Sequence, residues 1–352
     1  MTKVFVIDDS ALVRNGFKNI FEEMDDVELI GEAENPVDAF SIFKKVGLPD
    51  LFILDIEMPK MDGITFLKQI NAQRPTPVII CSTLVGAGSN TLVDAMRLGA
   101  AEIIEKPKNN LHEFFVTYKK DLIEKIRAVS KANINYQSNI NIDKVKAKKE
   151  QDLQIPSAKV IAIGSSTGGI QVLEEIFTHL NPKHLGIIVV QHIPKSFSAS
   201  LAKRLNELSV HSFVKEAQDG DIIMNNTIYI APGGLHVEVE KVGLKYYLRL
   251  KDFPKVNSHR PSVNVLFSSI AKVFRVNALG FILTGMGDDG AIGLKKMRDA
   301  GAKTYAQNEK TAAVYGMPKV ALDMGSAIKA LSIYEIIQTI NEEEYLNFKP
   351  KS

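Results

Sequence analysis

The sequence predicts an α/β protein with two domains, each a parallel β-sheet covered by helices on both faces. The 352 residues are enough for about two domains at ~150 residues each. Short apolar runs alternate with segments in which apolar residues recur every three or four positions, a pattern typical of alternating strands and helices. Polar residues often follow the apolar runs, at the strand ends where open α/β sheets carry their chemistry.

The overall composition limits the class of protein. Hydrophobic residues make up 45% of the chain and charged residues 24%, which is ordinary for a globular protein. The net charge of +2 gives no argument for binding to nucleic acid or to an anionic membrane surface. The chain start lacks the apolar stretch of a signal peptide, and no run reaches the ~18 apolar residues of a membrane helix. We therefore expect a soluble, cytoplasmic protein that does not insert into a membrane.

The single cysteine, Cys81, points to the same compartment. One cysteine excludes an internal disulfide and fits a reducing environment. Because Cys81 lies in the apolar run 77–81, we expect a small core residue and not a nucleophile.

The first domain, residues 1–126, alternates five strands with five helices. Its first strand is the β-rich run 3–7, and apolar residues at helical spacing follow over 12–21. Five such repeats imply a doubly wound parallel sheet, a (βα)5 domain. Further strands are expected at 27–31, 50–55, 77–82 and 101–104, and further helices at 37–46, 63–73, 91–98 and 111–128.

Charged and polar side chains gather at the strand ends of this domain. Asp8, Asp9 and Asp55 fall at carboxyl ends, as do Ser82 and Lys106. Three converging carboxylates repel one another unless a cation neutralises them, and oxygen ligands of this kind suit Mg²⁺. The alternative is that Asp8 and Asp9 merely cap the following helix. The combination of all five residues favours the cation site.

On these residues the first domain resembles a response-regulator receiver domain. The resemblance rests on Asp8-Asp9, the segment from Asp55 to Gly63, Ser82, and Lys106-Pro107. It implies that Asp55 accepts a phosphoryl group from a chemotaxis histidine kinase, and that Asp8, Asp9, Asp55 and the Glu57 carbonyl hold Mg²⁺. It also implies a phospho-switch, in which Ser82 moves towards the phosphate and Lys106 pairs with it. A new dianionic group does demand such charge partners.

Residues 127–157 differ in character from the segments on either side. They are rich in Asn, Gln, Ser and Lys and show no sustained period. The lysines could suggest contact with nucleic acid, but a solvated, flexible linker is the better interpretation. Such a tether would let the two domains dock and separate.

The second domain, residues 158–345, repeats the strand and helix alternation. Its strands are expected at 159–163, 186–191, 227–231, 279–283 and, as the last one, 303–306. A hairpin is expected from 236–240 and 246–250. The helices are expected at 170–180, 197–208, 261–274, 291–300 and 318–322.

The stretch Gly164-Ser165-Ser166-Thr167-Gly168-Gly169 runs from the first of these strands into a glycine turn and a helix. Such a turn stabilises negative charge through exposed N–H groups and the helix dipole. The glycines could therefore cradle a phosphate, or Ser166 could be a nucleophile on a strained turn. The stretch alone leaves both interpretations open.

Two further strand ends favour the nucleophile. His192 follows the strand 186–191, and Asp289 follows the strand 279–283, so Ser166, His192 and Asp289 should share one edge of the sheet. A serine hydroxyl needs an imidazole to take its proton, and the imidazole needs a carboxylate to orient it. Taken alone, each residue has another interpretation. Ser166 could cap a helix and His192 could be structural. Asp288 and Asp289 could be first-turn carboxylates that the helix dipole stabilises. Their occurrence on one edge favours a catalytic triad.

The remaining histidines are weaker candidates. His236 and His259 lie in loops near the predicted edge, whereas His179, His184 and His211 lie elsewhere and receive no role. No spacing of Cys and His residues suggests zinc.

The second domain resembles the catalytic domain of the chemotaxis protein-glutamate methylesterases (CheB type). The resemblance rests on the stretches 164–169, 191–194, 231–236, 259–263, 283–290 and 315–318. It implies that Ser166 is the nucleophile, His192 the base and Asp289 the orienting acid, with the Met286 N–H in the oxyanion hole. Two positions depart from the family: Asp288 stands where asparagine is frequent, and Asn264 where aspartate is frequent.

The same resemblance implies the activity. The enzyme would hydrolyse glutamate methyl esters, and deamidate glutamines, on the cytoplasmic helices of methyl-accepting chemoreceptors. The esterase reaction would need no cofactor. Phosphorylation of the receiver would raise turnover, and we expect a monomer.

A rival hypothesis from another class is a phosphorylation-controlled module that binds a nucleotide or a partner's phosphate. The glycine spacing from Gly164 to Gly169 departs from the G-x-G-x-x-G dinucleotide fingerprint. A P-loop is excluded as well, because Ile170 stands where that motif needs lysine.

Overall fold

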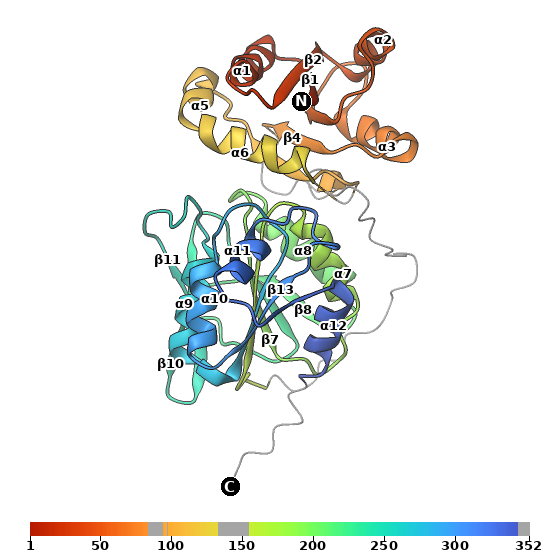
Figure 1. The fold of residues 1–352 in the computed structure, drawn as a ribbon. Coiled ribbons are helices and arrows are strands. Elements are labelled where there is room, and N and C mark those ends of the chain that lie inside the picture. The colour runs from red at the N-terminus through yellow and green to blue at the C-terminus, as the bar shows by residue number, and fades with distance from the viewer. Residues whose placement is uncertain (84–93, 97, 133–154, 344–352) are drawn as a thin grey trace. The chain divides into compact units, whose positions relative to one another are not determined.

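The computed structural model describes residues 1–83, 94–96, 98–132 and 155–343 (Figure 1). The chain divides into two compact units, Met1–Asn135 and Tyr136–Ser352. Most of the predicted linker 127–157 and part of the predicted helix 91–98 lie outside the described residues. No helix in the described part of the chain is long and apolar enough to cross a membrane.

The first unit is a five-stranded parallel sheet in the order β2-β1-β3-β4-β5, as the (βα)5 prediction requires. Figure 1 shows α1, α5 and α6 on one side of this sheet and α2 and α3 on the other. The strands are β1 (Thr2–Ile7), β2 (Val27–Ala33), β3 (Leu51–Leu54), β4 (Val78–Ser82) and β5 (Glu102–Glu105). The helices are α1 (Ala11–Phe21), α2 (Pro36–Val46), α3 (Gly63–Gln73), α5 (Leu111–Thr117) and α6 (Lys119–Ser130). Cys81 is buried in β4, as predicted.

The single helix predicted over 111–128 is wrong, because the chain breaks there into α5 and α6. Tyr118 leaves helical geometry with φ −99° and ψ 7°, so the two helices meet at an angle around it. Apolar residues keep a helical spacing across the break, and periodicity therefore cannot detect it. The β-branched pair Val116-Thr117 and Tyr118 are weak helix formers, which is the local reason for the break. α6 continues to Ser130, four residues beyond the expected end of the domain.

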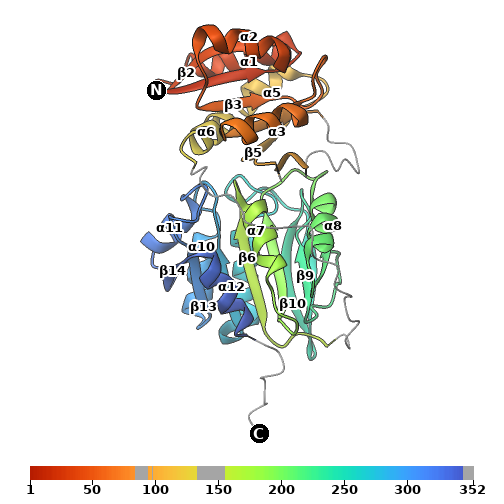
Figure 2. The ribbon, with the colours of Figure 1, turned by 90° about the vertical axis from the view of Figure 1, so that its right-hand side faces the viewer.

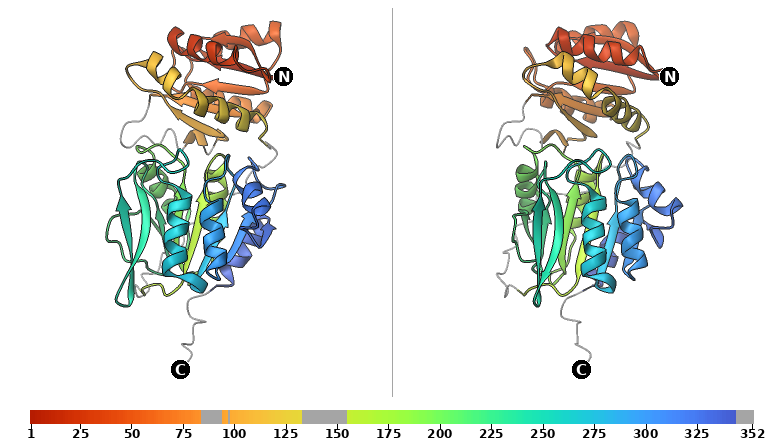
Figure 3. Two further views of the ribbon diagram at one scale, coloured as in Figure 1. Left: turned by 60° about the vertical axis from the view of Figure 1, so that its left-hand side comes forward. Right: turned by 90° about the vertical axis from the view of Figure 1, so that its left-hand side faces the viewer.

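The second unit is a seven-stranded parallel sheet in the order β14-β13-β12-β6-β7-β9-β8. Figure 2 shows α7, α8 and α12 over one face, and Figure 3 shows α9 and α10 side by side over the opposite face. The strands are β6 (Val160–Ser165), β7 (Gly186–Gln191), β8 (Phe213–Glu216), β9 (Thr227–Ile230), β12 (Ala278–Ile282), β13 (Lys303–Gln307) and β14 (Lys329–Leu331). The helices are α7 (Gly169–Thr178), α8 (Ser198–Leu208), α9 (Val263–Val273), α10 (Ala291–Asp299), α11 (Met317–Asp323) and α12 (Ile333–Asn341). The predicted hairpin is confirmed as β10 (His236–Val242) and β11 (Lys245–Lys251).

Both edge strands of this sheet and the helix α12 were not predicted from the sequence. Residues 303–306 are not the last strand, because β14 pairs beyond β13. β14 has three residues, of which only Leu331 is buried, and β8 alternates buried and exposed positions. Edge strands of this kind lack the continuous apolar run that marks a strand covered on both faces.

The strand order places a topological switch point at β6. The chain moves outward from β6 through β7 in one direction, and later returns to the other side of β6 with β12. Open α/β sheets bind their ligands in the crevice beside such a point. The ends of β6, β7 and β12 are therefore where the fold favours a site.

Before β7, a buried histidine makes the stability of the second unit depend on pH. His184 Nδ1 lies 2.7 Å from the Leu185 carbonyl oxygen and Nε2 lies 2.6 Å from Ser212 Oγ. The neutral ring satisfies both contacts, and burial lowers the pKa of His184 from 6.5 to about 4. The unfolded chain therefore protonates His184 at a higher pH than the folded chain does. Acidification from pH 6.5 to pH 4 favours the unfolded chain.

We expect the free energy of unfolding to fall by roughly 3 kcal/mol between pH 6.5 and pH 4 because of His184, at about 1.4 kcal/mol for each unit of pKa. Urea denaturation over this range should show a steeper loss for the wild type than for His184→Gln. Parallel curves for the two proteins would contradict the expectation.

Candidate active site and acidic pocket

The first unit brings the predicted acidic residues together at one edge of its sheet. Asp8 follows β1 and Asp55 follows β3, and these strands are neighbours. Carboxylate oxygens of Asp8, Asp9 and Asp55 all lie within 4.8 Å of one another. Lys106, which follows β5, places Nζ 2.6 Å from Asp8 Oδ2 and 2.7 Å from Asp55 Oδ2. Ser82 is buried at the end of β4, the strand between β3 and β5.

The electrostatics of this pocket fit a divalent cation. Burial raises the pKa of Asp8 to about 6, although the charge of Lys106 opposes this shift. Burial alone would lower the pKa of Lys106, but the negative charge of Asp8 raises it above its usual value. A set of three converging carboxylates offers the oxygen-only donors that Mg²⁺ prefers. The role of the Glu57 carbonyl stays a prediction.

In the second unit, Ser166 and His192 leave neighbouring strands at the same level. Ser165 and Gln191 are paired in the β6–β7 register, so the next residue of each strand is Ser166 and His192. The Ser166 N–H donates to the Thr284 carbonyl at 3.0 Å, and Gln191 Nε2 donates to the Ser166 carbonyl at 2.7 Å. The backbone on both sides of Ser166 is thus fixed by neighbouring strands.

His192 is paired with Asp289, as the sequence predicts. His192 Nε2 lies 2.9 Å from Asp289 Oδ2, and His192 Nδ1 is buried without a hydrogen-bond partner among the described residues. A carboxylate accepts hydrogen bonds only, so the ring proton sits on Nε2 and the Nδ1 lone pair is left to act as a base. Ser166 Oγ stands on the adjacent strand end and does not yet bond to Nδ1.

Three further donors hold the Asp289 carboxylate. Ser262 Oγ donates to Oδ1 at 2.8 Å, and the N–H groups of Val263 and Asn264 donate at 2.7 Å and 3.2 Å. These N–H groups open α9, so the carboxylate also occupies the positive end of that helix. Burial alone would raise the pKa of Asp289, but the hydrogen bond and charge of His192, with the Ser262 and Val263 bonds, hold it below its usual range. Asp289 therefore remains an anion beside His192.

Several residues that support this arrangement were not predicted from the sequence. Thr284 Oγ1 donates to the Thr167 carbonyl at 3.0 Å and accepts the Val314 N–H at 2.8 Å, which joins the serine turn to a distant loop. Ser262 and Gln191 likewise act as buried donors. The only sequence signal for them was a polar residue beside an apolar run, which also occurs at ordinary caps and strand ends.

Glycine is required next to Ser166. A Cβ atom at Gly285 would lie 2.6 Å from Ser166 Cβ, closer than two side chains approach. Met286 is the next residue after Gly285, and the role of its N–H in the oxyanion hole stays a prediction. Gly168 has φ 74° and precedes α7, a conformation that favours glycine in the serine turn.

The two positions that depart from the family make local contacts outside the His192–Asp289 pair. Asp288 Oδ1 accepts from Asn257 Nδ2 at 3.3 Å. Asn264 Oδ1 accepts the Gly293 N–H at 2.7 Å, where α9 and α10 approach closely. Each therefore ties neighbouring segments together.

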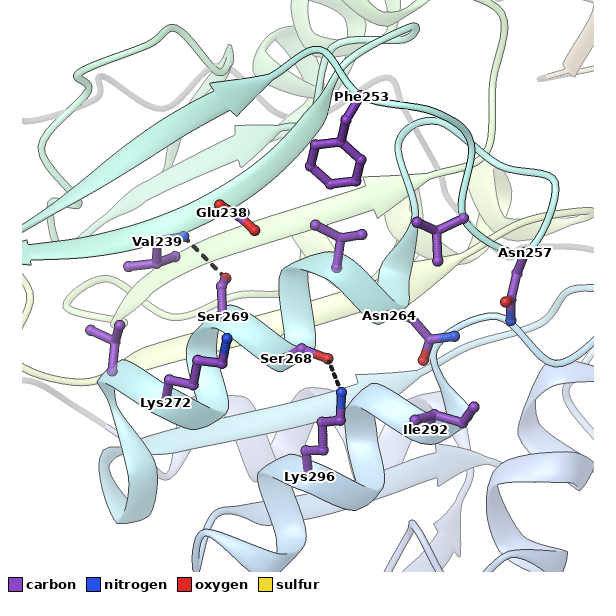
Figure 4. Close-up of a pocket in the computed structure, with 13 residues that line it drawn as sticks. Glu238, Val239, Phe253, Asn257, Asn264, Ser268, Ser269, Lys272, Ile292 and Lys296 are labelled. Atoms are coloured by element: carbon purple, nitrogen blue, oxygen red, sulfur yellow. Dashed lines mark hydrogen bonds between the residues drawn. The ribbon is translucent and has the colours of Figure 1, made fainter.

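A hollow of about 400 Å³ is lined by the hairpin strand β10, the loop after β11, α9 and α10 (Figure 4). Its lining mixes apolar side chains with Glu238, Lys272 and Lys296. Ser166, His192 and Asp289 do not belong to that lining. The candidate chemistry is thus at the sheet edge and not in this hollow.

Comparisons with known proteins agree with both units. The family model described as CheB methylesterase matches residues 161–340, and the response regulator receiver domain model matches residues 4–115. A protein-glutamate methylesterase/protein-glutamine glutaminase of Leptospira interrogans is 46% identical over 343 residues, covering 96% of this chain and 98% of the relative. A protein of the same name from Shewanella oneidensis is 43% identical over 352 residues, covering 97% of this chain and 98% of the relative.

A solved structure supports the fold of the second unit. The CheB methylesterase catalytic domain of Thermotoga maritima is 37% identical, with a TM-score of 0.51, and the match covers 52% of this chain and 97% of that domain. Nearly full-length relatives above 40% identity, together with the two family models, establish the relationship. The chain belongs to the CheB methylesterase family and carries a response-regulator receiver domain ahead of its catalytic domain.

Proposed function

We propose that this chain is a phosphorylation-activated protein-glutamate methylesterase that also deamidates glutamines on chemoreceptors. The observation that carries the proposal is the His192–Asp289 pair beside Ser166, at the switch point of a CheB-type domain. Its kinase partner would belong to the chemotaxis system, because the receiver needs a phosphodonor. The protein would act as a cytoplasmic monomer, without inserting into the membrane or binding nucleic acid.

The catalytic residues act in the following order. Ser166 Oγ attacks the ester carbonyl carbon of a methylated glutamate, and its proton passes to His192 Nδ1. Asp289 stabilises the resulting imidazolium through Nε2. The negative oxygen is stabilised by the Met286 N–H and the start of α7, typically worth ~3 kcal/mol for each donor. His192 returns the proton to the leaving methoxide, and methanol departs.

Water completes the reaction. His192 Nδ1 removes a proton from water, and the hydroxide formed attacks the acyl carbon. The bond to Ser166 Oγ then breaks, His192 returns the proton to Oγ, and the glutamate carboxylate is released. A glutamine substrate follows the same route, with ammonia as the leaving group. The ester reaction takes every proton from groups of this chain or from water, so we propose that it needs no cofactor.

Regulation would begin at the acidic pocket. Asp8, Asp9 and Asp55, with the Glu57 carbonyl, would hold Mg²⁺, which supplies positive charge to the oxygens of the incoming phosphoryl group. Lys106 already contacts Asp55 at 2.7 Å and would pair with the phosphoryl oxygens, while Ser82 would move to supply a hydroxyl. We propose that the unphosphorylated receiver covers the active-site edge and that phosphorylation weakens this docking.

Methanol release from a methylated chemoreceptor tests both activity and regulation. A small phosphoryl donor with Mg²⁺ should raise the wild-type rate roughly 5- to 100-fold, the usual range of coupling between two sites. Asp55→Asn should stay at the basal rate, because it removes the acceptor carboxylate.

Asp62→Asn is the matched control, because Asp62 caps α3 through the Thr65 N–H at 2.9 Å and asparagine can do the same. This variant should respond to the donor like the wild type. An Asp55→Asn protein that is still activated would refute the phosphorylation site. Tight nucleotide binding without methanol release would instead support the rival binding module.

A further inference from the structure

His259 lies flat against the imidazole of His192. The two ring centroids are 3.7 Å apart, and the ring planes differ by 9°. A ring nitrogen of each histidine and a carboxylate oxygen of Asp289 all lie within 4.8 Å of one another. None of the catalytic steps from attack to deacylation uses His259, although it touches the general base directly.

A tight turn of the chain holds His259 in this place. The Val256 N–H donates to the His259 carbonyl at 3.0 Å, and the His259 N–H returns a bond to the Val256 carbonyl at 2.9 Å. Asn257 and Ser258 between them have φ 49° and φ 65°, as in a two-residue type I′ turn. The His259 ring is fixed as well, because Nδ1 lies 2.5 Å from the Asn257 carbonyl oxygen.

The same turn is tied to the segment that carries the catalytic acid. Asn257 Nδ2 donates to Asp288 Oδ1 at 3.3 Å, one residue before Asp289. His259 is thus oriented by its own turn and by the loop that orients His192. Both contacts restrain the place of the His259 ring against His192.

A metal site is the alternative interpretation of two histidines beside a carboxylate. A metal ion binds an imidazole in the plane of the ring, along the nitrogen lone pair. Parallel rings stacked face to face direct their lone pairs side by side, so His192 and His259 cannot converge on one ion without breaking the stack. The geometry therefore favours a contact between the rings over a shared ligand.

Resting on the proposed esterase function, we propose that His259 is a positioning residue for His192. The stacked ring fixes the rotation of the His192 imidazole, so that Nε2 stays on Asp289 and Nδ1 stays available to Ser166. It also stabilises the imidazolium that forms during the reaction, because a cation is attracted to the face of a neutral aromatic ring.

This role requires an uncharged His259. A protonated His259 would repel the imidazolium of His192 at close contact. Of the charged groups around the stack, Asp288 and Asp289 are carboxylates, and the turn itself carries Lys255 and Arg260. The Arg260 guanidinium is paired with Asp252, at the start of the loop after β11, at 2.6 Å. In the proposed arrangement a neutral ring, and not a second cation, therefore lies against the imidazolium.

The test compares methyl-ester hydrolysis by the wild type, His259→Phe and His259→Ala at neutral pH. Phenylalanine keeps a flat, uncharged ring, so kcat should stay within about 3-fold, and alanine should lose about tenfold in kcat with KM unchanged. NMR of the imidazole nitrogens should show the His192 ring proton fixed on Nε2 in the wild type and in His259→Phe, but not in His259→Ala.

Ser258→Gly is the matched control, since glycine accepts the positive φ of that position and leaves both rings in place. It should behave like the wild type. Equal losses of kcat in the Phe and Ala variants would overturn the inference while the esterase activity stood. If His259→Ala misfolds, the Phe variant still decides, because a tenfold loss of kcat in it would overturn the inference. A wild type that releases no methanol would instead overturn the proposed function.

Discussion

Ser166→Ala should lower methanol release from a methylated chemoreceptor by at least about 10³-fold. The variant keeps the turn and the binding surface but removes the only atom that forms the acyl-enzyme. Some acceleration over water should remain, because oxyanion stabilisation and substrate binding do not depend on the hydroxyl. Single-turnover assays would show loss of the acyl-enzyme, and a serine-reactive ester probe should no longer label the protein.

The neighbouring Ser165 provides a stringent control. Ser165 Oγ is buried and has no hydrogen-bond partner among the described residues, and it lies on the side of Gly169 and Gln191. Ser165→Ala should therefore keep activity within about 3-fold, since it removes no satisfied bond. An active Ser166→Ala together with an inactive Ser165→Ala would move the nucleophile by one residue. Circular dichroism would check that both variants fold.

Asp289→Asn should lower kcat by about 10² to 10⁴-fold, with a smaller effect on KM. With its oxygen at the Oδ1 position, the asparagine can still accept from Ser262 Oγ and the Asn264 N–H. Its NH₂ group then takes the Oδ2 position, where it faces His192 and the Val263 N–H loses its acceptor. His192 Nε2 must then accept a hydrogen bond, so the ring proton moves to Nδ1. The nitrogen that should take the Ser166 proton is then already protonated, and the base is lost.

Asp288→Asn is the matched control for this substitution. Asp288 is the adjacent carboxylate, and it accepts from Asn257 Nδ2 and not from the His192 ring. The change should leave kcat within about 3-fold, since it does not touch the imidazole. The proton shift in Asp289→Asn can be followed by NMR of the imidazole nitrogens. Unchanged kcat in Asp289→Asn would refute the role of this carboxylate.

The architecture follows from the sequence where strands are covered on both faces. β7 holds an unbroken apolar run, 187–190, between Gly186 and Gln191, and such a run predicts a buried parallel strand whose end carries polar residues. The same logic predicted that Asp8, Asp55 and Lys106 would meet, because parallel strand ends share an edge. The edge strands were missed because they lack a continuous apolar run, and the break at Tyr118 was missed because the apolar spacing continues across it.

The sequence could name the candidate site residues but not their detailed contacts. Nothing in the sequence indicates that Asp289 bonds to His192 Nε2 and leaves His192 Nδ1 to take the proton. Around the His192 ring, Asp289 and its partner Ser262 meet the His259 stack, and these residues come from two separate segments of the chain. His259 was a weaker candidate in the sequence because loop position gives no ring orientation.

The Asp289 carboxylate also has a consequence for how this domain can evolve. The same oxygens that orient His192 accept the first N–H groups of α9, so catalysis and the anchoring of one helix depend on a single side chain. Substitution of Asp289 is therefore opposed twice, by selection for turnover and by selection against misfolding. Substitutions elsewhere that shift the start of α9 should impair the chemistry before they impair folding. Substitutions that are not tolerated near the start of α9 therefore indicate a loss of catalysis and not only a loss of stability.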